Sequence, residues 1–389
     1  MAKLSYAELV DVISGEVTES LVSNGSLVET HNNVAGLVDK ISMIFTLDSV
    51  YNIDKLNMFD GQYLSYGKII ENWWQDLILP TDFDESGSGA LSPSNPTYRP
   101  VFYSYPIQRK TVKTTVRNND LERAVHNAEQ LAELVAKQFK RLEDSVAVYK
   151  YQVKMQMLGT YCSMCLKQSI YDDIGGASAI TEYAISTAYS VNDLVCDDDS
   201  TPTKVAIFVK PVANTNTKTW ATLVAEGTLI ELDLFTDIKI PTDTSTGEAF
   251  IKRLKKDIEI LSDINEGHSL NGNSLGATEG LVLIVKQGVI PDLQVETYAG
   301  TFQLDQMRLG ADIVVPANFG QILDSDENDF TDKVFAILLD KRGMRLHNTY
   351  DATRANQNGA GDFENYFRHT DNTAFISRNT AVKVYADLS

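Results

Sequence analysis

Residues 68–116 read KIIENWWQDLIL (Lys68–Leu79), PTDFDESGSGALSPSNPTYRP (Pro80–Pro100) and VFYSYPIQRKTVKTTV (Val101–Val116). The first piece is aliphatic and aromatic, the second has the prolines, glycines, serines and acids of turns, and the third has the aromatic and β-branched residues of strands. This order predicts a long two-armed hairpin. A ribbon of this kind has no core of its own and is marginally stable in water. Because loops this long are usually functional, we expect it to lie on another copy of the chain.

A long amphipathic helix is predicted directly after the hairpin. Asn118–Asp120 offer an N-cap, and Glu122 supports the first turn. Apolar residues then recur at helical spacing over Leu121–Phe139 and again over Leu142–Cys165. Gly159 is the first glycine or proline to interrupt this pattern. The two stretches therefore form either one bent helix or two consecutive helices.

The pattern downstream changes to short strands and a second helix. We expect a helix over Ser245–Leu261, capped by Ser245 or Thr246, and a flexible stretch over Asn265–Gly280. Another helix is predicted over Pro291–Leu309. The expected strands are Thr203–Val212, Thr228–Ile240, the continuously apolar Leu281–Gly288, and Ala311–Pro316.

The tail carries further strands without a helix of their own. Val334–Asn348 predicts two strands around a turn at Lys341–Gly343, and Phe363–Asp371 and Phe375–Asp387 predict two more. We expect them to return to the sheet that the long helix covers. The predicted division is an N-terminal arm (residues 1–60), the hairpin (61–117), the long helix with the first part of one domain (118–239), an α/β domain (240–332) and the returning strands (333–389).

Composition places the chain among globular proteins of about two subdomains. Its 389 residues are 43% hydrophobic and 22% charged. No apolar run approaches the roughly 18 residues of a membrane span, and the start turns acidic too soon for a signal peptide. Three cysteines do not form a disulfide framework, which favours a reducing cytoplasm.

The charge balance limits the choice of partners. Lysine and arginine number 34 against 53 aspartates and glutamates, a net charge of −19. This excludes a dedicated nucleic-acid binder, which would be basic. It is compatible with a wall beside nucleic acid that must not adhere to it, and equally with acidity that only aids solubility.

Motifs that could carry chemistry are incomplete. CSMC (Cys162–Cys165) lies within a helical pattern and lacks the two further ligands of a zinc site. DSDENDF (Asp324–Phe330) begins like a calcium loop, but Asp329 replaces the required glycine and Phe335 the bidentate glutamate. None of the five histidines forms a recognisable metal or nucleophile motif. The sequence predicts no catalytic, cofactor or metal site, and therefore no enzyme.

The order of elements resembles the major capsid proteins of tailed bacteriophages, which have the Hong Kong 97-type fold, and is most similar to the short-tailed phi-29 group. Two stretches carry the resemblance. One is NNDLERAVHNAEQLAELVAKQFKRLEDSVAVYKYQVKMQML (Asn118–Leu158), a long helix followed by a Tyr-rich helical segment. The other extends from LVLIVKQGVIPDLQVETYAGTFQLDQ (Leu281–Gln306) through VFAILLDKRGMRLHNTY (Val334–Tyr350) to FENYFRHTDNTAFISRNTAVKVYAD (Phe363–Asp387).

The resemblance implies an α+β subunit that self-assembles into hexamers and pentamers of an icosahedral shell around double-stranded DNA. The hairpin would be the extended loop that crosses a neighbouring subunit, the long helix a spine, and residues 240–332 an axial domain. Implied partners are other copies of the chain, scaffolding and portal proteins, and packaged DNA in loose contact. The chain would assemble in the host cytoplasm. The expected interface residues are Trp73, Trp74, Phe83, Phe102, Tyr103, Tyr105, Arg109 and Lys110.

Other functions stay open at this point. An encapsulin-type nanocompartment shares the fold but lacks a portal and DNA. A tail or connector protein is a second alternative, which the absence of repeats disfavours. An enzyme of an unknown kind would need a site built from residues interpreted here as structural.

Overall fold

The computed structural model describes residues 54–64, 70–75, 98–102, 105–106, 109–117, 128–169, 180–198, 203–277, 279–289, 311–316, 318–323 and 328–388. The described residues fall into two compact units. The first unit draws on Met1–Lys68, Pro106–Lys154 and Leu346–Ala374, and the second on Ile69–Tyr105, Met155–Arg345 and Phe375–Ser389.

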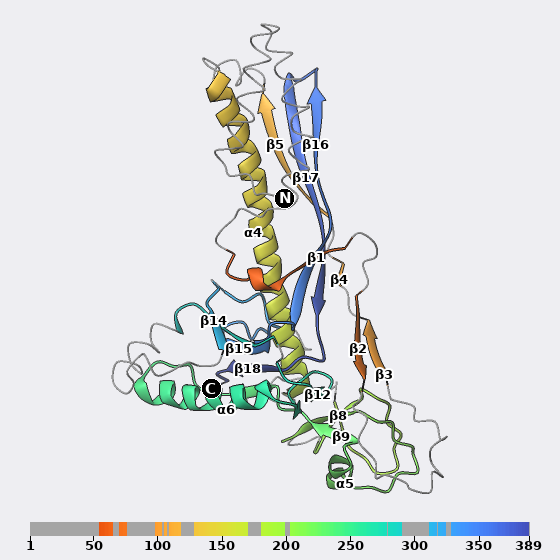
Figure 1. Ribbon diagram of the computed structural model, residues 1–389. Helices are drawn as coiled ribbons and strands as arrows, with labels where there is room; N and C mark the ends of the chain where they lie inside the picture. The colour runs from red at the N-terminus through yellow and green to blue at the C-terminus, as the bar shows by residue number, and fades with distance from the viewer. Residues whose placement is uncertain are drawn as a thin grey trace, which may run out of the picture. The chain divides into compact units, whose positions relative to one another are not determined.

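The first unit pairs a long helix with a long-stranded sheet. Helix α4 (Ala128–Ser169) is a single helix of 42 residues, so the one-helix alternative is right. Its predicted cap at Asn118–Asp120 lies outside the described residues. Figure 1 shows α4 beside the strands of this sheet. The strand order is β1 (Asp60–Tyr63), β16 (Met344–Asn358), β17 (Phe363–Ile376) and β4 (Tyr105–Pro106), and β5 (Lys110–Arg117) also pairs with β17.

The position of β5 corrects the predicted hairpin. The sequence analysis assigns residues 110–116 to the returning arm of the ribbon, whereas β5 pairs antiparallel with β17 over its whole length, from Lys110 opposite Thr370 to Arg117 opposite Phe363. Val116 is 8% exposed. An alternating strand must bury its apolar side against a core, and β17 together with α4 supplies one that a two-stranded ribbon lacks.

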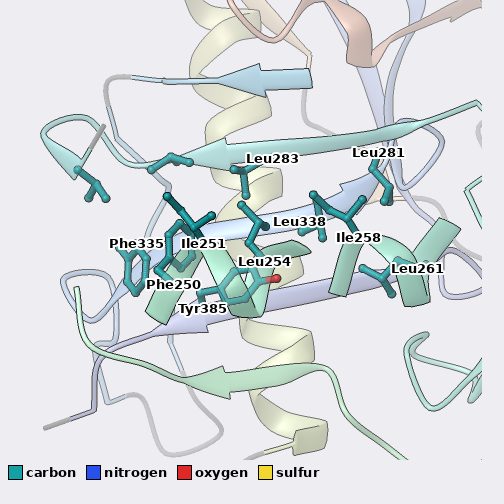
Figure 2. Close-up of a cluster of buried hydrophobic side chains, with 14 residues drawn as sticks. Phe250, Ile251, Leu254, Ile258, Leu261, Leu281, Leu283, Phe335, Leu338 and Tyr385 are labelled. Carbon is teal, nitrogen blue, oxygen red and sulfur yellow. The ribbon is translucent and has the colours of Figure 1, made fainter. Parts of the chain in front are cut away.

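The second unit has its core between a sheet and helix α6 (Thr244–Ser262). Phe250, Leu254 and Ile258 of α6 meet Leu283 and Leu338 of the sheet, as Figure 2 shows. Every residue of β13 and β15 is buried, as the continuous apolar runs predict. The strand order is β10 (Phe235–Asp237), β18 (Val382–Ala386), β15 (Val334–Asp340), β13 (Leu281–Val285) and β14 (Ala311–Val314).

The tail supplies strands to both sheets, whereas the sequence analysis predicts one. β15 and β16 flank the turn at Lys341–Gly343 as predicted, but each joins a different sheet. β17 belongs to the sheet of the first unit, and β18 lies between β10 and β15 in the second. Two strands of the tail thus complete the α/β sheet expected from residues 240–332.

A smaller sheet in the second unit packs around aromatic rings. Tyr189 stacks on Phe208 with ring centroids 4.5 Å apart, and Tyr183 contacts both rings and Trp220. The elements are β6 (Thr181–Glu182), β7 (Leu194–Cys196), β8 (Val205–Phe208), β9 (Leu229–Glu231) and helix α5 (Trp220–Ala225). The remaining short elements among the described residues are η1 (Asn57–Phe59), β2 (Glu71–Gln75), β3 (Tyr98–Phe102), β11 (Asn265–Glu266) and β12 (Asn273–Ser274).

Two local predictions in this unit are wrong. Helix α6 is capped by Asp243, whose carboxylate accepts from the Thr246 backbone N–H at 2.8 Å, and not by Ser245 or Thr246. The stretch expected to be flexible contains the β11–β12 hairpin, and its polar Ser269 and Asn271 are buried. Turn-forming residues mark a loop, but they do not reveal whether tertiary contacts cover it. The helix expected over Pro291–Leu309 lies outside the described residues.

A buried polar cluster beside this hairpin predicts a pH dependence of stability. The Lys383 ammonium is fully buried and donates to the Asp233 carboxylate and, at 3.0 Å, to its carbonyl oxygen. The Asp233 carbonyl oxygen also lies 2.9 Å from His268 Nδ1. Burial lowers the pKa of His268 below its ordinary value of 6.5, and Lys383 lowers it further, although Asp233 opposes the shift.

Just below pH 6.5, His268 is therefore protonated in the unfolded chain but still neutral in the folded one. Because the folded pKa is the lower one, folding stability should fall as pH drops below 6.5, by at most about 1.4 kcal/mol per pH unit. His268→Gln should flatten this slope. Urea unfolding of both proteins between pH 7 and pH 5 measures it, and equal slopes would contradict the assignment.

Candidate assembly surface

A two-stranded ribbon exists as β2 and β3, although β3 begins at Tyr98, three residues before the predicted returning arm. They pair antiparallel over five residues each, with Glu71 opposite Phe102 and Gln75 opposite Tyr98. Two expected interface residues, Trp73 and Trp74, are adjacent on β2, opposite Pro100 and Arg99. The structure therefore places Trp73, Trp74 and Phe102 together on one two-stranded ribbon, while Phe83 and Tyr103 lie outside the described residues.

The other three expected interface residues lie further along the chain. Tyr105 is in β4, and Lys110 begins β5. The Arg109 guanidinium lies 4.5 Å above the ring of Tyr350, and its Nη2 is 3.7 Å from the Asp371 carboxylate. The Arg109 side chain is still 56% exposed, so its own chain orients it without enclosing it.

Buried ion pairs join α4 to the sheet of the first unit. The fully buried Lys154 ammonium is 2.5 Å from carboxylate oxygens of both Asp54 and Asp60. One turn earlier, Lys150 lies 4.0 Å from Asp351, and burial lowers the pKa of this lysine while Asp351 opposes that shift. Arg368 of β17 binds the same Asp351 through two hydrogen bonds of 3.0 Å.

These ion pairs have a structural role. Removing one partner of a buried pair leaves an uncompensated charge, which destabilises a fold strongly. Charged hydrogen bonds also require a specific geometry, so they hold the helix in one register on the sheet.

The sheet of the first unit has one face toward α4 and one away from it. Tyr366 of β17 contacts Phe139 of α4, with ring centroids 5.3 Å apart. Thr114 pairs with Tyr366 and therefore shares its face, as does Val116. The alternate positions of β5, including Lys113 and Arg117, point away from the helix. Both are exposed.

Within the part of the chain that the structure describes, no side-chain cluster is suited to binding a metal ion. No group of three or more histidine, cysteine, aspartate and glutamate side chains in this part of the chain could hold a metal ion. Cys162 and Cys165 are buried in α4, and burial raises the pKa of the Cys162 thiol to about 12. A thiol in this environment is inert. No helix among the described residues is long and apolar enough to cross a membrane.

A family model decides the identification. The model of the Phi29-like phage major capsid protein family matches residues 15–385. The chain belongs to this family. The predicted resemblance to the phi-29 group is thereby confirmed. The protein is a structural component of a virion, whose capsid is assembled from repeated subunits.

One solved structure supports the fold, and two others are reported beside it as similar chains. A chain from the capsid structure of Staphylococcus phage Andhra is similar to this capsid protein with a TM-score of 0.51 at 11% identity, over 87% of this chain and 84% of that one. A chain of bacteriophage P68 gives a TM-score of 0.49 at 12% identity, covering 88% and 86% of the two chains. A capsid chain of Cyanophage P-SCSP1u gives 0.48 at 8% identity, covering 85% and 86%. No curated protein matches.

The exposed cations of β5 form a feature that the sequence analysis only partly identifies. Arg109 and Lys110 are among the expected interface residues, whereas Lys113 and Arg117 are not. The signal is visible in the sequence, since Arg109, Lys113 and Arg117 recur at every fourth position. Strand alternation places residues at this spacing on one face. Recognising it requires knowing that β5 pairs with β17 and presents one face to solvent.

Proposed function

We propose that this capsid protein forms the shell itself, as hexamers and pentamers of an icosahedral capsid around double-stranded DNA, and that its fold is of the Hong Kong 97 type. The family match over residues 15–385 carries the proposal. The described elements support it: a 42-residue helix beside a long-stranded sheet, a separate α/β unit, and a two-stranded ribbon.

The domain roles follow from these elements. Residues 61–117 contain the extended loop, with β2 and β3 as its paired arms. Residues 118–239 and 333–389 contain α4 and the strands of the peripheral domain, and residues 240–332 provide α6, β13 and β14 of the axial domain. The axial sheet also takes β15 and β18 from the tail. Residues 1–60 would act as an N-terminal arm.

The partners of assembly follow from the same proposal. Scaffolding and portal proteins would guide closure of the shell in the host cytoplasm, and the subunit would perform no enzymatic reaction. Packaged DNA would touch the inner wall only loosely. The net charge of −19 supports this, because like charges repel and prevent the wall from gripping the DNA.

Size-exclusion chromatography with light scattering, followed by negative-stain microscopy, tests the shell. The protein is expressed with and without its neighbouring genes. Closed particles of megadalton mass, or rings of five and six subunits, are expected. A 43.1 kDa monomer with all partners present would overturn the proposal.

Truncating the two tryptophans of the ribbon should impair assembly without unfolding the subunit. Tryptophan is enriched among the few residues that dominate interface energies, and truncating such a residue costs about 2 kcal/mol or more. We therefore expect Trp73→Ala and Trp74→Ala together to reduce the yield of particles in light scattering. Ile185→Ala removes an apolar side chain that is 50% exposed elsewhere and serves as the control. Normal assembly of the double variant would show that the ribbon is no interface.

A further inference from the structure

The face of β5 that points away from α4 alternates between cations and threonines. Arg109, Lys113 and Arg117 are four residues apart, so they share this face at intervals of about 13 Å along an extended strand. Thr111 and Thr115 lie between them on the same face. All of these residues are exposed. We call Arg109, Lys113 and Arg117 the basic face.

Aromatic rings from neighbouring strands orient two of these cations. Lys113 pairs with Phe367 in the sheet, and its ammonium lies 5.6 Å from the centre of that ring. The Arg109 guanidinium lies 4.5 Å above the ring of Tyr350. A ring beneath a cation holds it in place without neutralising its charge. The basic face is therefore an ordered positive surface.

Little negative charge opposes this surface. The β17 residues that pair with the outward positions of β5 are Phe363, Asn365, Phe367 and His369. None of them is acidic. The Asp371 carboxylate lies 3.7 Å from Arg109, but its side chain is only 4% exposed. The exposed charge of the basic face therefore stays positive.

A fourth cation extends the positive charge across the sheet. Tyr350 of β16 contacts Arg109 on the face that points away from α4. The next residue, Asp351, lies on the opposite face, 4.0 Å from Lys150 of α4. Arg354 is four residues beyond Tyr350, so strand alternation places it on the side of the basic face, and it is exposed. The cations thus occupy two strands, β5 and β16, with β17 between them.

We propose that the basic face binds the phosphate backbone of duplex DNA through contacts that do not read the base sequence. The inference rests on the proposed shell function, and it assigns the loose contact with packaged DNA to one surface. Lysine, arginine and threonine side chains are ordinary donors to phosphate oxygens, and such contacts position a duplex without reading it. The three cations span about 26 Å of extended strand. They therefore suit a long, regular polyanion, because duplex DNA carries one charge per ~1.7 Å of its axis.

The net charge of −19 limits the strength of this contact. The acidic remainder of the chain repels phosphates, so a few ordered cations give weak binding that depends strongly on salt. A dedicated nucleic-acid binder would instead be basic over a whole domain. The basic face is thus a local point of contact on a wall that otherwise repels DNA.

An acidic surface of another protein is the competing occupant. The centre of a protein–protein interface is depleted of charged residues and enriched in aromatic side chains. On the outward face of β5 the exposed side chains are cations and threonines, and Phe367 is half-buried beneath Lys113. Protein–DNA interfaces are more polar and much more positively charged than protein–protein interfaces. The composition of the basic face therefore favours phosphate.

Duplex binding by the full-length chain tests the inference. The probe is a fluorescent duplex of about 20 base pairs, which at ~3.4 Å per step is longer than the row of cations. Fluorescence anisotropy gives the binding constant at several salt concentrations. Lys113→Gln with Arg117→Gln should weaken binding at low salt at least about tenfold. The slope of log binding constant against log salt should become shallower by about 1.8, since each phosphate contact contributes about 0.9.

Two further variants separate the effect from folding and net charge. Lys255→Gln with Lys256→Gln removes the same charge from the exposed side of α6 and should leave affinity and slope unchanged. Arg354→Gln removes a cation from another strand and should make the slope shallower by about 0.9. Circular dichroism and melting temperature establish that each variant is folded.

Lysine modification tests the same contact in assembled particles. Particles with and without DNA are treated with an amine-acylating reagent, and mass spectrometry measures the modified fraction of each lysine. Lys113 should be modified more slowly in filled particles than in empty ones, because phosphates cover its ammonium. Lys255 should be modified equally in both.

Three results would overturn the inference. The first is folded variants that bind the duplex as the wild type does, and the second is equal modification of Lys113 in filled and empty particles. The third is a folded Lys113→Gln with Arg117→Gln protein that no longer forms particles, which would assign the face to a contact between proteins. If the wild-type chain forms no particles, the proposed shell function fails, and duplex binding by the subunit still decides whether the basic face binds phosphate.

Discussion

Phe250→Ala should lower the free energy of unfolding by about 3–5 kcal/mol, a large part of the stability of a domain. Phe250 is 2% exposed and lies on the buried side of α6. Its ring contacts Phe335 and Tyr385 edge-on, with centroids 5.3 and 5.4 Å away. Truncation removes these contacts and opens a cavity that rigid strands on the other side cannot close.

Urea unfolding, followed by circular dichroism, measures this loss. Ile313→Ala is the control, because it truncates an apolar side chain of the same sheet that is 46% exposed. The control should change the unfolding free energy by only about 0.5 kcal/mol. If Phe250→Ala and Ile313→Ala cost the same, α6 does not pack on the sheet as described.

Elements with a strong internal pattern could be predicted from the sequence. The apolar repeat over Leu142–Cys165 predicts a helix, and Leu142, Val146 and Val153 are indeed buried in α4. The all-apolar run at Leu281 likewise predicts β13, which is buried throughout. Hydrophobic periodicity is a local property, so a helix or strand can be predicted from it without knowledge of the rest of the fold.

Pairing between distant segments could not be predicted in the same way. β5 follows the hairpin in sequence but pairs with β17, some 250 residues later, as the hydrogen bond of 2.7 Å from Thr115 to Asn365 illustrates. The alternating pattern of β5 fits pairing within the ribbon as well as pairing with β17. Burial against a core decides between these two pairings, and the sequence pattern does not show it. Lys113 and Arg117 were missed for this reason, because the exposure of their side chains depends on that pairing.

The predicted capping residue of α6 was also wrong, by two or three positions. Ser245 and Thr246 are both good N-cap residues by type, and so is Asp243. Asp243 is the cap because Thr246 then occupies the third helical position. There the Thr246 hydroxyl accepts a hydrogen bond of 3.1 Å from the Asp243 backbone N–H. A sequence that offers several caps in a row leaves helix boundaries open by a residue or two.

Gly320 marks a close approach of two backbones that an added side chain should disrupt. A Cβ at Gly320 would lie 2.5 Å from Gln156 Cα and 2.7 Å from the carbonyl oxygen of Met155. A Cβ at Gly159, on the facing turn of α4, would lie 2.7 Å from the carbonyl oxygen of Gln321. The Gly320 N–H donates to the Met155 carbonyl oxygen at 2.9 Å, so the two segments are held together at this separation.

Gly320→Ala should therefore destabilise the second unit by about 3 kcal/mol, the upper end for overpacking. The clash is with backbone, which cannot rotate away as a side chain could. Relief requires residues 318–323 to move off α4, which breaks the hydrogen bond to Met155. Thermal unfolding by calorimetry should show the loss as a lowered melting temperature.

Gly359→Ala provides the matched control, because a Cβ there would meet nothing within 4 Å. It should shift stability by no more than about 0.5 kcal/mol. A Gly320→Ala protein as stable as Gly359→Ala would mean that α4 and residues 318–323 do not touch. If the loss appears, particle formation should be poorer as well, because a less stable second unit leaves fewer folded copies that can assemble.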